Sequence, residues 1–550
     1  MEKNYKLKIY WNAEENTPVI LEEKKAQSNK NLRYMTSDIR PVFILEKHLL
    51  KSVFENVLDE KVYTSEIWVN KQGKYFIDGK IFNFSITSES KKIADKSKFV
   101  SNLLSFIPTQ EYLEIEKKQI EKFVRLNFER YKYITEFEGV DEEGYIVGAY
   151  PFVKQMTEKY STRINVVSFS GGKDSTVVSH IVRKALNKDE VLHVFGDTTL
   201  EFPLTYNYLE RFKDNNPFIP FIEERNYENN FFEICDKIGP PSRVKSWCCS
   251  IFKTGPMGTT FAEIDAQLLT FYGIRRNESV SRSKYLRVSK SPKIEKQIVA
   301  SPIIDWLDAD IWLYILTEKL DFNDAYRQGF ARVGCWCCPN NSYWSDFLMS
   351  IYNHEQYDKW RNFLLEFSKR IGKEDYETYV DDGKWKARQG GTGIELAKRI
   401  RLSTKECIAE NNSKSYELNR EIDDEFFEMF KPFGKINFEF GNSKIGEVYI
   451  LNRNNEIDFK LLAKKGSKKV RITIVNNKEQ HIFSKIENQL RKFNTCIYCK
   501  ACNSSCPIGA LSVSLNAYKI DENLCTHCLK CVTHFNMGCL IASSLVIKKE

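Results

Sequence analysis

Eight of the fifteen cysteines lie between residues 496 and 539, and their spacing constrains this chain more than any other feature. The first run is Cys496-x2-Cys499-x2-Cys502-x3-Cys506-Pro507, and the second is Cys525-x2-Cys528-x2-Cys531-x7-Cys539. Three thiolates at such short spacing can hold three corners of one 4Fe–4S cubane. The fourth ligand then comes from the other run, because the chain has already turned away. We therefore expect one cluster on Cys496, Cys499, Cys502 and Cys539, and a second on Cys525, Cys528, Cys531 and Cys506.

This C-terminal segment resembles a bacterial two-cluster ferredoxin domain. It differs from that pattern at its last ligand, since seven residues rather than three precede Cys539 and no proline follows it. A pair of zinc knuckles is the alternative, because four cysteines also bind zinc. Two zinc sites would not need the x3-Cys-Pro step, so iron–sulfur clusters are favoured.

Composition is that of an ordinary globular protein. Of the 550 residues, 42% are apolar and 28% charged, and 82 Lys and Arg against 74 Asp and Glu leave a net charge of +8. This excludes wholesale disorder, and the modest positive charge permits anionic ligands without marking a nucleic-acid binder. No apolar run reaches the ~18 residues that a membrane helix needs. The N-terminus has no signal-peptide core, so we expect a cytoplasmic protein with no membrane partner.

A glycine loop, SFSGGKDST at 168–176, follows a β-branched run and precedes a helical pattern. Glycines at such a junction let backbone N–H groups approach an anion, and the helix N-terminus adds positive potential. Lys173 can offset phosphate charge, and Ser170 and Ser175 offer hydroxyl donors. The spacing of the glycines is not that of a Walker loop.

The hexapeptide SGGKDS resembles the PP-loop of ATP pyrophosphatases and sulfonucleotide reductases. Three further segments, FGDTTLEFPLTYNYL (195–209), YGIRRNESVSR (272–282) and SPIIDWLDADIW (301–312), extend a resemblance to the phosphoadenosine phosphosulfate (PAPS) reductase family over about 160–340. Thr199 and Leu204 stand where that family usually has Gly and Glu.

The resemblance implies a nucleotide site, with two groups of residues. Nucleotide-binding residues are expected to be Ser170, Gly171, Gly172, Ser175, Asp197 and Thr198. Residues that position and clamp the anion are expected to be Lys173, Asp174, Arg275, Arg276 and Arg282, since arginine forks suit phosphate and sulfate. A solvated basic face is the alternative reading of the three arginines.

Five further cysteines form two small groups in the central part of the chain. Cys248, Cys249, Cys335 and Cys338 resemble the ligand set of adenosine phosphosulfate (APS) reductases, which implies a third 4Fe–4S cluster beside the nucleotide. Adjacent cysteines cannot easily share one tetrahedral zinc. A reduced set without metal is the alternative. Cys337 is interpreted as a free thiol or a small packed residue.

Strands that alternate with helices over 163–320 predict a parallel sheet covered on both faces. The predicted fold class is α/β, with a doubly wound, mostly parallel sheet of the PP-loop, adenine nucleotide alpha hydrolase-like type. We expect a β-rich module at 1–95, a helical connector at 96–160 and the PP-loop domain at 161–345. A helical extension at 346–430, a small α/β segment at 431–493 and the ferredoxin-type domain at 494–545 complete the predicted organisation.

Three functional hypotheses follow. The first is an iron–sulfur APS or PAPS reductase-like enzyme that takes electrons from a low-potential donor through its own ferredoxin domain. In place of the Glu-Cys-Gly-Leu-His tail of assimilatory reductases, the sequence carries that cysteine-rich segment. The second is an ATP pyrophosphatase that adenylates a nucleic acid or small molecule for sulfur insertion, as in DNA phosphorothioation or tRNA thiolation. The basic run KKGSKKVR (464–471) suits it, although such runs are usually solvated turns. The third is a subunit that only senses nucleotide.

Overall fold

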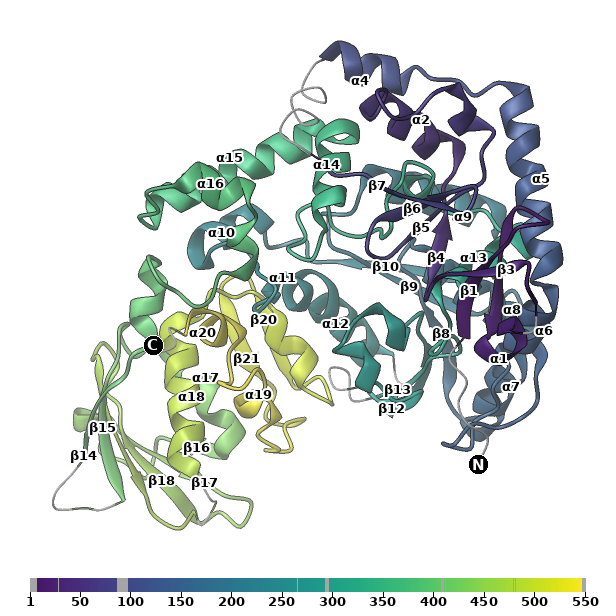
Figure 1. The fold of residues 1–550 in the computed structure, drawn as a ribbon. Helices are drawn as coiled ribbons and strands as arrows, with labels where there is room; N and C mark the ends of the chain where they lie inside the picture. Colours follow the sequence, from purple (N-terminus) through teal and green to yellow (C-terminus); the bar gives the residue numbers. More distant parts are fainter. Residues whose placement is uncertain are drawn as a thin grey trace.

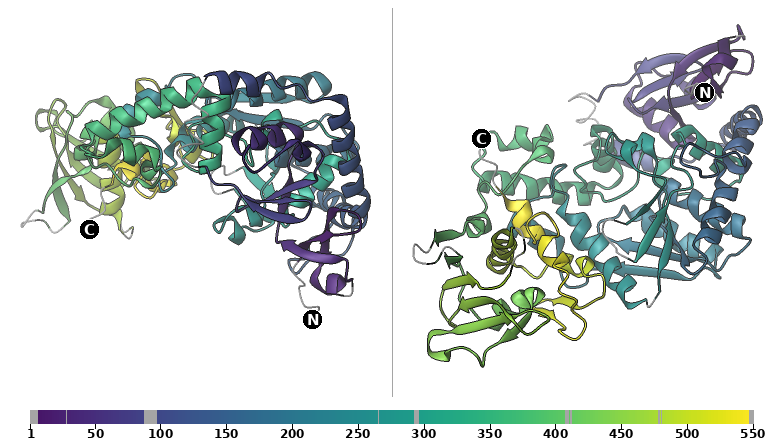
Figure 2. Two further views of the ribbon diagram at one scale, coloured as in Figure 1. Left: turned by 45° about the horizontal axis from the view of Figure 1, so that its top comes forward. Right: turned by 90° about the horizontal axis from the view of Figure 1, so that it is seen from below.

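The computed structural model describes residues 7–27, 29–86, 97–264, 266–291, 296–406, 410, 412–477, 479 and 481–546. Cys407 lies outside these residues. Figures 1 and 2 show the N-terminal strands (purple) on one side of a central sheet and a second large sheet (green) at the opposite end of the molecule. No helix in these ranges is long and apolar enough to cross a bilayer.

The central sheet has the strand order β10-β9-β8-β11-β13-β12, and only β12 runs antiparallel to its neighbour. Its strands are β8 (Ile164–Ser168), β9 (Leu192–Asp197), β10 (Phe221–Arg225), β11 (Leu268–Phe271), β12 (Val288–Lys290) and β13 (Gln297–Ala300). The chain adds β9 and β10 on one side of β8 and then returns to the other side with β11. The predicted α/β class with a mostly parallel sheet is confirmed.

Helices cover both faces of this sheet because successive side chains of each strand point to opposite sides. The helices are α7 (Ala149–Lys159), α8 (Lys173–Leu186), α9 (Pro203–Asn215), α12 (Gly255–Glu263) and α13 (Asp308–Thr317). Val167 packs with α7, α8 and α13, whereas Val166 packs with Met257 and Phe261 of α12. The sheet is therefore doubly wound.

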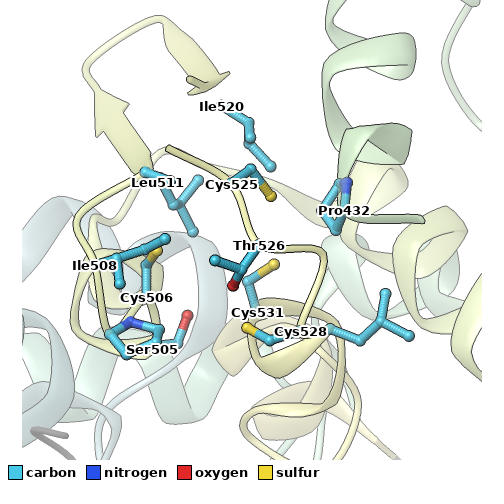
Figure 3. A pocket seen from close by; sticks show the side chains of 13 residues that line it. Pro432, Ser505, Cys506, Ile508, Leu511, Ile520, Cys525, Thr526, Cys528 and Cys531 are labelled. Atoms are coloured by element: carbon cyan, nitrogen blue, oxygen red, sulfur yellow. The ribbon is translucent and has the colours of Figure 1, made fainter. Parts of the chain in front are cut away.

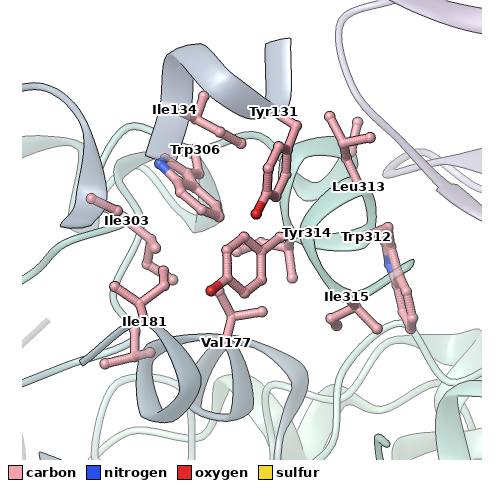
Figure 4. Packing of buried hydrophobic residues seen from close by; sticks show 14 of the residues in the cluster. Tyr131, Ile134, Val177, Ile181, Ile303, Trp306, Trp312, Leu313, Tyr314 and Ile315 are labelled. Atoms are coloured by element: carbon pink, nitrogen blue, oxygen red, sulfur yellow. The ribbon is translucent and has the colours of Figure 1, made fainter. Parts of the chain in front are cut away.

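Aromatic side chains join the helices on the first face. Figure 4 shows Tyr314 of α13 between Tyr131 and the α8 residues Val177 and Ile181. Tyr131 belongs to α6 (Phe128–Glu136), and its ring centroid is 5.9 Å from that of Tyr314. This packing fixes α13, whose first residue reaches the glycine loop.

The N-terminal module contains two antiparallel sheets with the orders β2-β1-β3 and β4-β5-β6-β7. Their elements are β1 (Leu7–Asn12), β2 (Thr17–Glu22), α1 (Glu23–Gln27), β3 (Leu32–Thr36), β4 (Ile39–Pro41), α2 (Ile44–Val53), β5 (Ile67–Asn70), β6 (Lys74–Ile77) and β7 (Lys80–Asn83). The strands β5 and β6 form a hairpin across the turn KQG. The strands β6 and β7 form a second hairpin, because Asp78 and Gly79 both have positive φ, as a tight two-residue turn requires.

Helices then connect this module to the central domain and continue beyond it. The connecting helices are α4 (Ser97–Leu104), α5 (Gln110–Leu126), α6 and α7. After the central sheet come α14 (Tyr343–Tyr352), α15 (His354–Arg370) and α16 (Tyr376–Asp381).

The expected helical extension to residue 430 is wrong in its last part. Residues 403–417 form β14 (Ser403–Glu406) and β15 (Ser413–Glu417), which pair into the antiparallel sheet β14-β15-β19-β18-β17-β16. The other strands are β16 (Lys435–Asn437), β17 (Glu447–Leu451), β18 (Ile457–Leu462) and β19 (Lys469–Ile474). The sequences of β14 and β15 are short and mostly polar, so they carry no strand signal of their own. They become strands because β15 pairs with β19, which lies more than fifty residues further along the chain.

Two helices cover this sheet, α17 (Asp424–Phe430) and α18 (Ile482–Thr495). The cysteine-rich segment packs on the same core through the hairpin β20 (Leu511–Ser514) and β21 (Ala517–Ile520), whose Val513 and Tyr518 are buried against α17 and α18. It ends in α19 (Lys530–Thr533) and α20 (Leu540–Leu545).

Candidate functional site

The glycine loop occupies the point where the strand order reverses, between the carboxyl ends of β8 and β11. Ligands of open α/β sheets bind at such switch points. Gly171 has φ +67°, and a Cβ there would lie 2.9 Å from Thr205 Cγ2. Gly273, after β11, passes so close to the start of α8 that a Cβ would lie 2.8 Å from the Asp174 carbonyl carbon. Gly171 is therefore required by its positive φ and by the Thr205 side chain, and Gly273 by the close approach of the α8 backbone.

Side chains hold the loop in one conformation. Ser175 accepts from Ser170 N (3.1 Å) and donates to Gly172 O (2.8 Å). Asn323 Nδ2 donates to Gly171 O (3.2 Å), and the Tyr326 hydroxyl accepts from Lys173 N (3.0 Å). The predicted serines thus shape the loop.

Lys173 and Asp174 belong to a buried group of four charges with Arg275 and Asp308. Lys173 Nζ lies 3.1 Å from carboxylate oxygens of both Asp174 and Asp308. Arg275 Nε lies 2.5 Å from Asp174, and its Nη2 lies 2.8 Å from Asp308. Burial alone would raise the pKa of Asp174, but Arg275 and Lys173 outweigh it and hold that pKa well below its usual range. Two cations and two anions balance, so the group is neutral before any ligand binds.

One donor in this group has no partner. Arg275 is 3% exposed, and its Nη1 is buried without a hydrogen bond among the described residues. A buried N–H without an acceptor is costly. Beside a glycine loop and a helix N-terminus, this orphan donor fits an anionic oxygen.

The other two predicted arginines have different environments. Arg276 Nη1 lies 2.7 Å from Asp305 and Nη2 lies 3.0 Å from Glu143. Arg282 pairs with Glu278. Both guanidinium groups are thus satisfied by carboxylates near the surface, whereas Arg275 alone of the three joins the loop.

The segment that follows β9 contacts Cys335, one of the central cysteines. Asp197 accepts from Thr199 N and from the Tyr206 hydroxyl, each at 2.7 Å, so it shapes the turn. Thr199, which stands in place of the family's glycine, has φ +61° and is strained there. The Thr198 hydroxyl lies 3.3 Å from Cys335 Sγ.

A buried carboxyl group that sequence reasoning missed lies at the same place. Glu201 accepts from Thr198 (3.0 Å), and its backbone pairs with Cys335. Burial raises the pKa of Glu201, while Lys253 opposes that shift. The only signal in the sequence was a Glu within an otherwise apolar stretch.

The four central cysteines lie together. Cys248 and Cys249 end the short helix α11 (Trp247–Cys249), which runs directly into a π-helical turn, Ser250–Thr254. A hydrogen bond with Cys249 and burial raise the pKa of Cys248 well above its usual value, and the charge of Cys335 adds to this. Burial likewise raises the pKa of Cys338, with Cys249 nearby. Cys337 is buried at 3% exposure in the adjoining apolar core, as a packed residue would be.

The C-terminal cysteines lie in two neighbouring groups. Figure 3 shows the sulfur atoms of one set around a small pocket of about 20 Å³ with apolar walls that include Leu511 and Ile520. This set is Cys506, Cys525, Cys528 and Cys531. In the other set burial raises the pKa of the Cys499 thiol well above its usual value, and the neighbouring Cys502, Cys539 and Cys496 add to this. Cys539 therefore lies with the first run, despite its longer spacing.

The donors of these sets are four thiolates each, which is the donor set that a cubane uses. No group of three or more His, Cys, Asp or Glu side chains in the described ranges converges as the ligands of one metal ion would. A cubane needs another geometry, because each thiolate binds a separate iron at its own corner. Four cysteines around an apolar pocket meet that need.

The cysteine sets adjoin one another through a shared core. Cys499 and Cys539 are buried in the same apolar cluster as Trp247, Ile251 and Cys337, with Cys248 and Cys335 packed against it. The turn Ala501–Ser505 lies on α12, where a Cβ at Gly258 would meet Ser504 Cβ at 2.7 Å. The first C-terminal set and the central cysteines therefore share one apolar core, and Cys335 of the central group contacts Thr198 and Glu201.

The N-terminal module contributes a further residue that no motif indicated. Asp38, which is 4% exposed, accepts from the backbone N–H groups of Asp308 and Ala309, each at 3.0 Å. It thereby caps α13 and fixes Asp308 in the charge group. Lys71 of the same module lies 3.1 Å from Asp38 and donates to Asn277 O (2.7 Å), two residues after Arg275.

Comparisons with known proteins found several similarities. Residues 149–341 match the family described as phosphoadenosine phosphosulfate reductase domain. An adenosine 5'-phosphosulfate reductase of Oceanobacillus iheyensis is 30% identical over 195 residues, which cover 35% of this chain and 78% of that protein. An uncharacterized protein of Methanocaldococcus jannaschii is 29% identical over 359 residues, which cover 61% of this chain and 72% of that protein. The crystal structure of the Candida auris phosphoadenylyl-sulfate reductase aligns with a TM-score of 0.28 at 17% identity, over 42% of this chain and 98% of that one.

Proposed function

The chain belongs to the phosphoadenosine phosphosulfate reductase family through residues 149–341, and we propose that it is an iron–sulfur APS or PAPS reductase-like enzyme. Its electrons would come from a low-potential donor through its own C-terminal ferredoxin-type domain. The observation that supports the proposal is the apolar core shared by Cys499, Cys539 and the central cysteines, of which Cys335 contacts Thr198 beside the glycine loop.

The loop supplies the nucleotide site of this proposal. The N-terminus of α8 and the unpartnered Nη1 of Arg275 offer donors to an anionic ligand. Asp174 holds Arg275 in place and also pairs with Lys173, so neither Lys173 nor Asp174 meets the ligand as a free charge. The adenylyl anion therefore meets an oriented donor instead of a mobile surface charge, which favours a fixed pose.

The reaction consumes two electrons. In adenylyl sulfate the bond between sulfur and the bridging oxygen breaks, sulfur(VI) becomes sulfur(IV) and leaves as sulfite, and AMP keeps the oxygen. Clusters on the two C-terminal cysteine sets would each take one electron from the donor, and a cluster on the central cysteines would pass these two electrons on to the sulfate. The chain's own part is to bind the adenylyl group and to hold the sulfate end near Cys335, next to Thr198.

The second candidate is an ATP pyrophosphatase that activates a nucleic acid or small molecule for sulfur insertion. The basic run at 464–471 favours it, because Lys464, Lys465, Lys468 and Lys469 are exposed on the C-terminal sheet. Lys465 pairs with Asp424, which reduces the free charge of this run.

An anaerobic assay separates the two candidates. The reconstituted full-length chain is given a reduced low-potential donor and labelled APS, PAPS or ATP in turn. Sulfite and AMP from a sulfonucleotide support the reductase, whereas pyrophosphate and AMP from ATP, without sulfite, would replace it by the second candidate. Iron and sulfide should each approach about twelve per chain, from three cubanes.

Ligand variants test the electron route. The double variant Cys525→Ser/Cys528→Ser should abolish donor-dependent sulfite formation and leave nucleotide affinity unchanged. Both residues belong to the set that lines the pocket in Figure 3, away from the glycine loop. Cys337→Ser is the matched control, since this buried cysteine lies outside all three sets and should keep full iron content. Normal donor-dependent turnover in the double variant would show that electrons take another path.

A further inference from the structure

One buried cation in the cysteine-rich region has no role in the function proposed above. Lys492, in the last turn of α18, is 1% exposed although it belongs to a helix that looks basic and amphipathic. Its Nζ donates to Cys531 O at 2.7 Å and lies 3.5 Å from the Tyr518 hydroxyl. Lysine is rarely buried this fully unless it is paired.

No carboxylate of the described residues pairs with it. On the same helix, Lys485 pairs with Glu479 and Arg491 pairs with Glu487, both nearer the surface. Moving an ammonium group from water into a protein interior without a paired anion costs roughly several kcal/mol of folding free energy. The burial of Lys492 therefore needs a negative partner that is not a side-chain carboxylate.

The surroundings of Lys492 place it between the two C-terminal cysteine sets. Cys531, whose carbonyl it contacts, belongs to the set that lines the pocket in Figure 3. The ring centroid of Tyr518, which is 2% exposed, lies 5.4 Å from Lys492 Nζ. Tyr518 belongs to the apolar core against which Cys531 of one set and Cys496 and Cys502 of the other set pack.

We propose that Lys492 is a shared counter-ion for the two C-terminal iron–sulfur clusters and makes it easier for both to be reduced. The inference rests on the proposed function, because it requires both sets to hold clusters. A cubane with four thiolates is an anion whose negative charge grows by one on reduction. A fixed cation between two such anions stabilises each reduced form and offsets their mutual repulsion in a low-dielectric interior.

The consequence concerns two-electron chemistry. Without the cation, an electron on one cluster disfavours an electron on its neighbour. With Lys492 between them, both C-terminal clusters can be reduced at the same donor potential. The pair could then deliver the two electrons that sulfite formation requires in close succession.

Redox titration of the full-length reconstituted protein, followed by electron paramagnetic resonance, tests this inference. Lys492→Met keeps the length and removes the charge, Lys492→Gln keeps a hydrogen-bond donor without the charge, and Lys492→Arg keeps the charge. At a fixed potential, the reduced-to-oxidised ratio of both C-terminal clusters should fall at least about tenfold in the Met and Gln variants, a shift of ~59 mV. The Arg variant should stay within about threefold of the wild type, ~28 mV.

Lys485→Met is the control, because Lys485 lies on the same helix but pairs with Glu479 near the surface. Cys499→Ser and Cys528→Ser assign the two signals to their sets. Unchanged potentials in the Gln and Met variants, or a shift of one cluster alone, would overturn the shared counter-ion. If Met fails to incorporate iron, the Gln variant decides. A wild-type protein that binds no iron at these cysteines would instead refute the proposed function, and the inference with it.

Discussion

Replacing Arg275 with Met tests the charge balance at the glycine loop. Methionine has a similar length but no charge, so Lys173 would then face both Asp174 and Asp308 alone. Arg275 contacts these two carboxylates at 2.5 and 2.8 Å, and their side chains are only 20% and 13% exposed. Removing one partner of a buried ion pair costs about 3–5 kcal/mol. We expect about 3 kcal/mol here, because both carboxylates keep some contact with water.

The double variant Arg275→Met/Asp308→Asn separates stability from ligand binding. It leaves one cation, Lys173, with one anion, Asp174, so it should recover at least half of the lost stability. In both variants the nucleotide affinity should be about 10–150-fold weaker than in the wild type, which corresponds to the loss of one charge-assisted contact of ~1.5–3 kcal/mol. Denaturant unfolding followed by tryptophan fluorescence gives the first quantity, and calorimetric titration with APS or ATP gives the second.

The dependence on pH has a defined sign. The pKa of Asp174 lies well below its usual range, so its stabilising contribution is complete above about pH 4 and is lost only on acidification below that. In Arg275→Met the remaining buried carboxylates have lost a cation, so the pKa of one of them should rise. The stability deficit of the variant should therefore be larger at pH 8 than at pH 5.

Two results would refute this reasoning. Wild-type nucleotide affinity in Arg275→Met would mean that the unpartnered Nη1 does not face the ligand. A double variant no more stable than the single one would mean that charge balance does not hold these four residues together.

Three further outcomes are expected. Asp38→Ala should destabilise the start of α13 by about 0.5–2 kcal/mol. The amides of Asp308 and Ala309 should then exchange faster with solvent. The control Asp423→Ala, which removes the cap of α17, should leave those two amides protected. Burial lowers the pKa of His193 to about 4, so its ring signal in histidine-labelled NMR should not titrate near pH 6.5, and about 2 kcal/mol of stability should be lost between pH 7 and pH 5; a midpoint above pH 6 contradicts this. Thr199→Gly should raise the unfolding free energy by about 0.5–1 kcal/mol, because it relieves a β-branched residue at positive φ, and an unchanged denaturation midpoint would show that the turn is not strained.

Much of the central fold follows from local pattern. The β-branched run before the glycine loop and the helical pattern after it correspond to β8 and α8, and the alternation over 163–320 predicted the parallel sheet. The strands β14 and β15 were missed because their residues are mostly polar, those of β14 are exposed, and β15 pairs with β19, far along the chain. Pairing between distant segments leaves no periodic mark in either one.

Neighbouring residues illustrate the same limit at the site. Arg275 and Arg276 are adjacent and chemically identical, yet one is 3% exposed within the charge group and the other pairs with surface carboxylates. Asp38, which caps α13 from 270 residues away, carries no motif at all. Which arginine is buried depends on where Asp308 and Asp174 meet, and that is set by the order of strands.

The sequence by itself determined what short-range chain geometry fixes. The cysteine spacing alone assigned the two C-terminal sets, because ligands three residues apart must reach the same small volume. Tertiary structure alone decided which charges are buried and what they face. Lys492 looked like one more surface lysine, but the packing of α18 against β21 and Cys531 places it among cysteines. Burial and charge pairing arise from contacts between distant segments, and in a low-dielectric interior those contacts decide what a charge costs and what it can do.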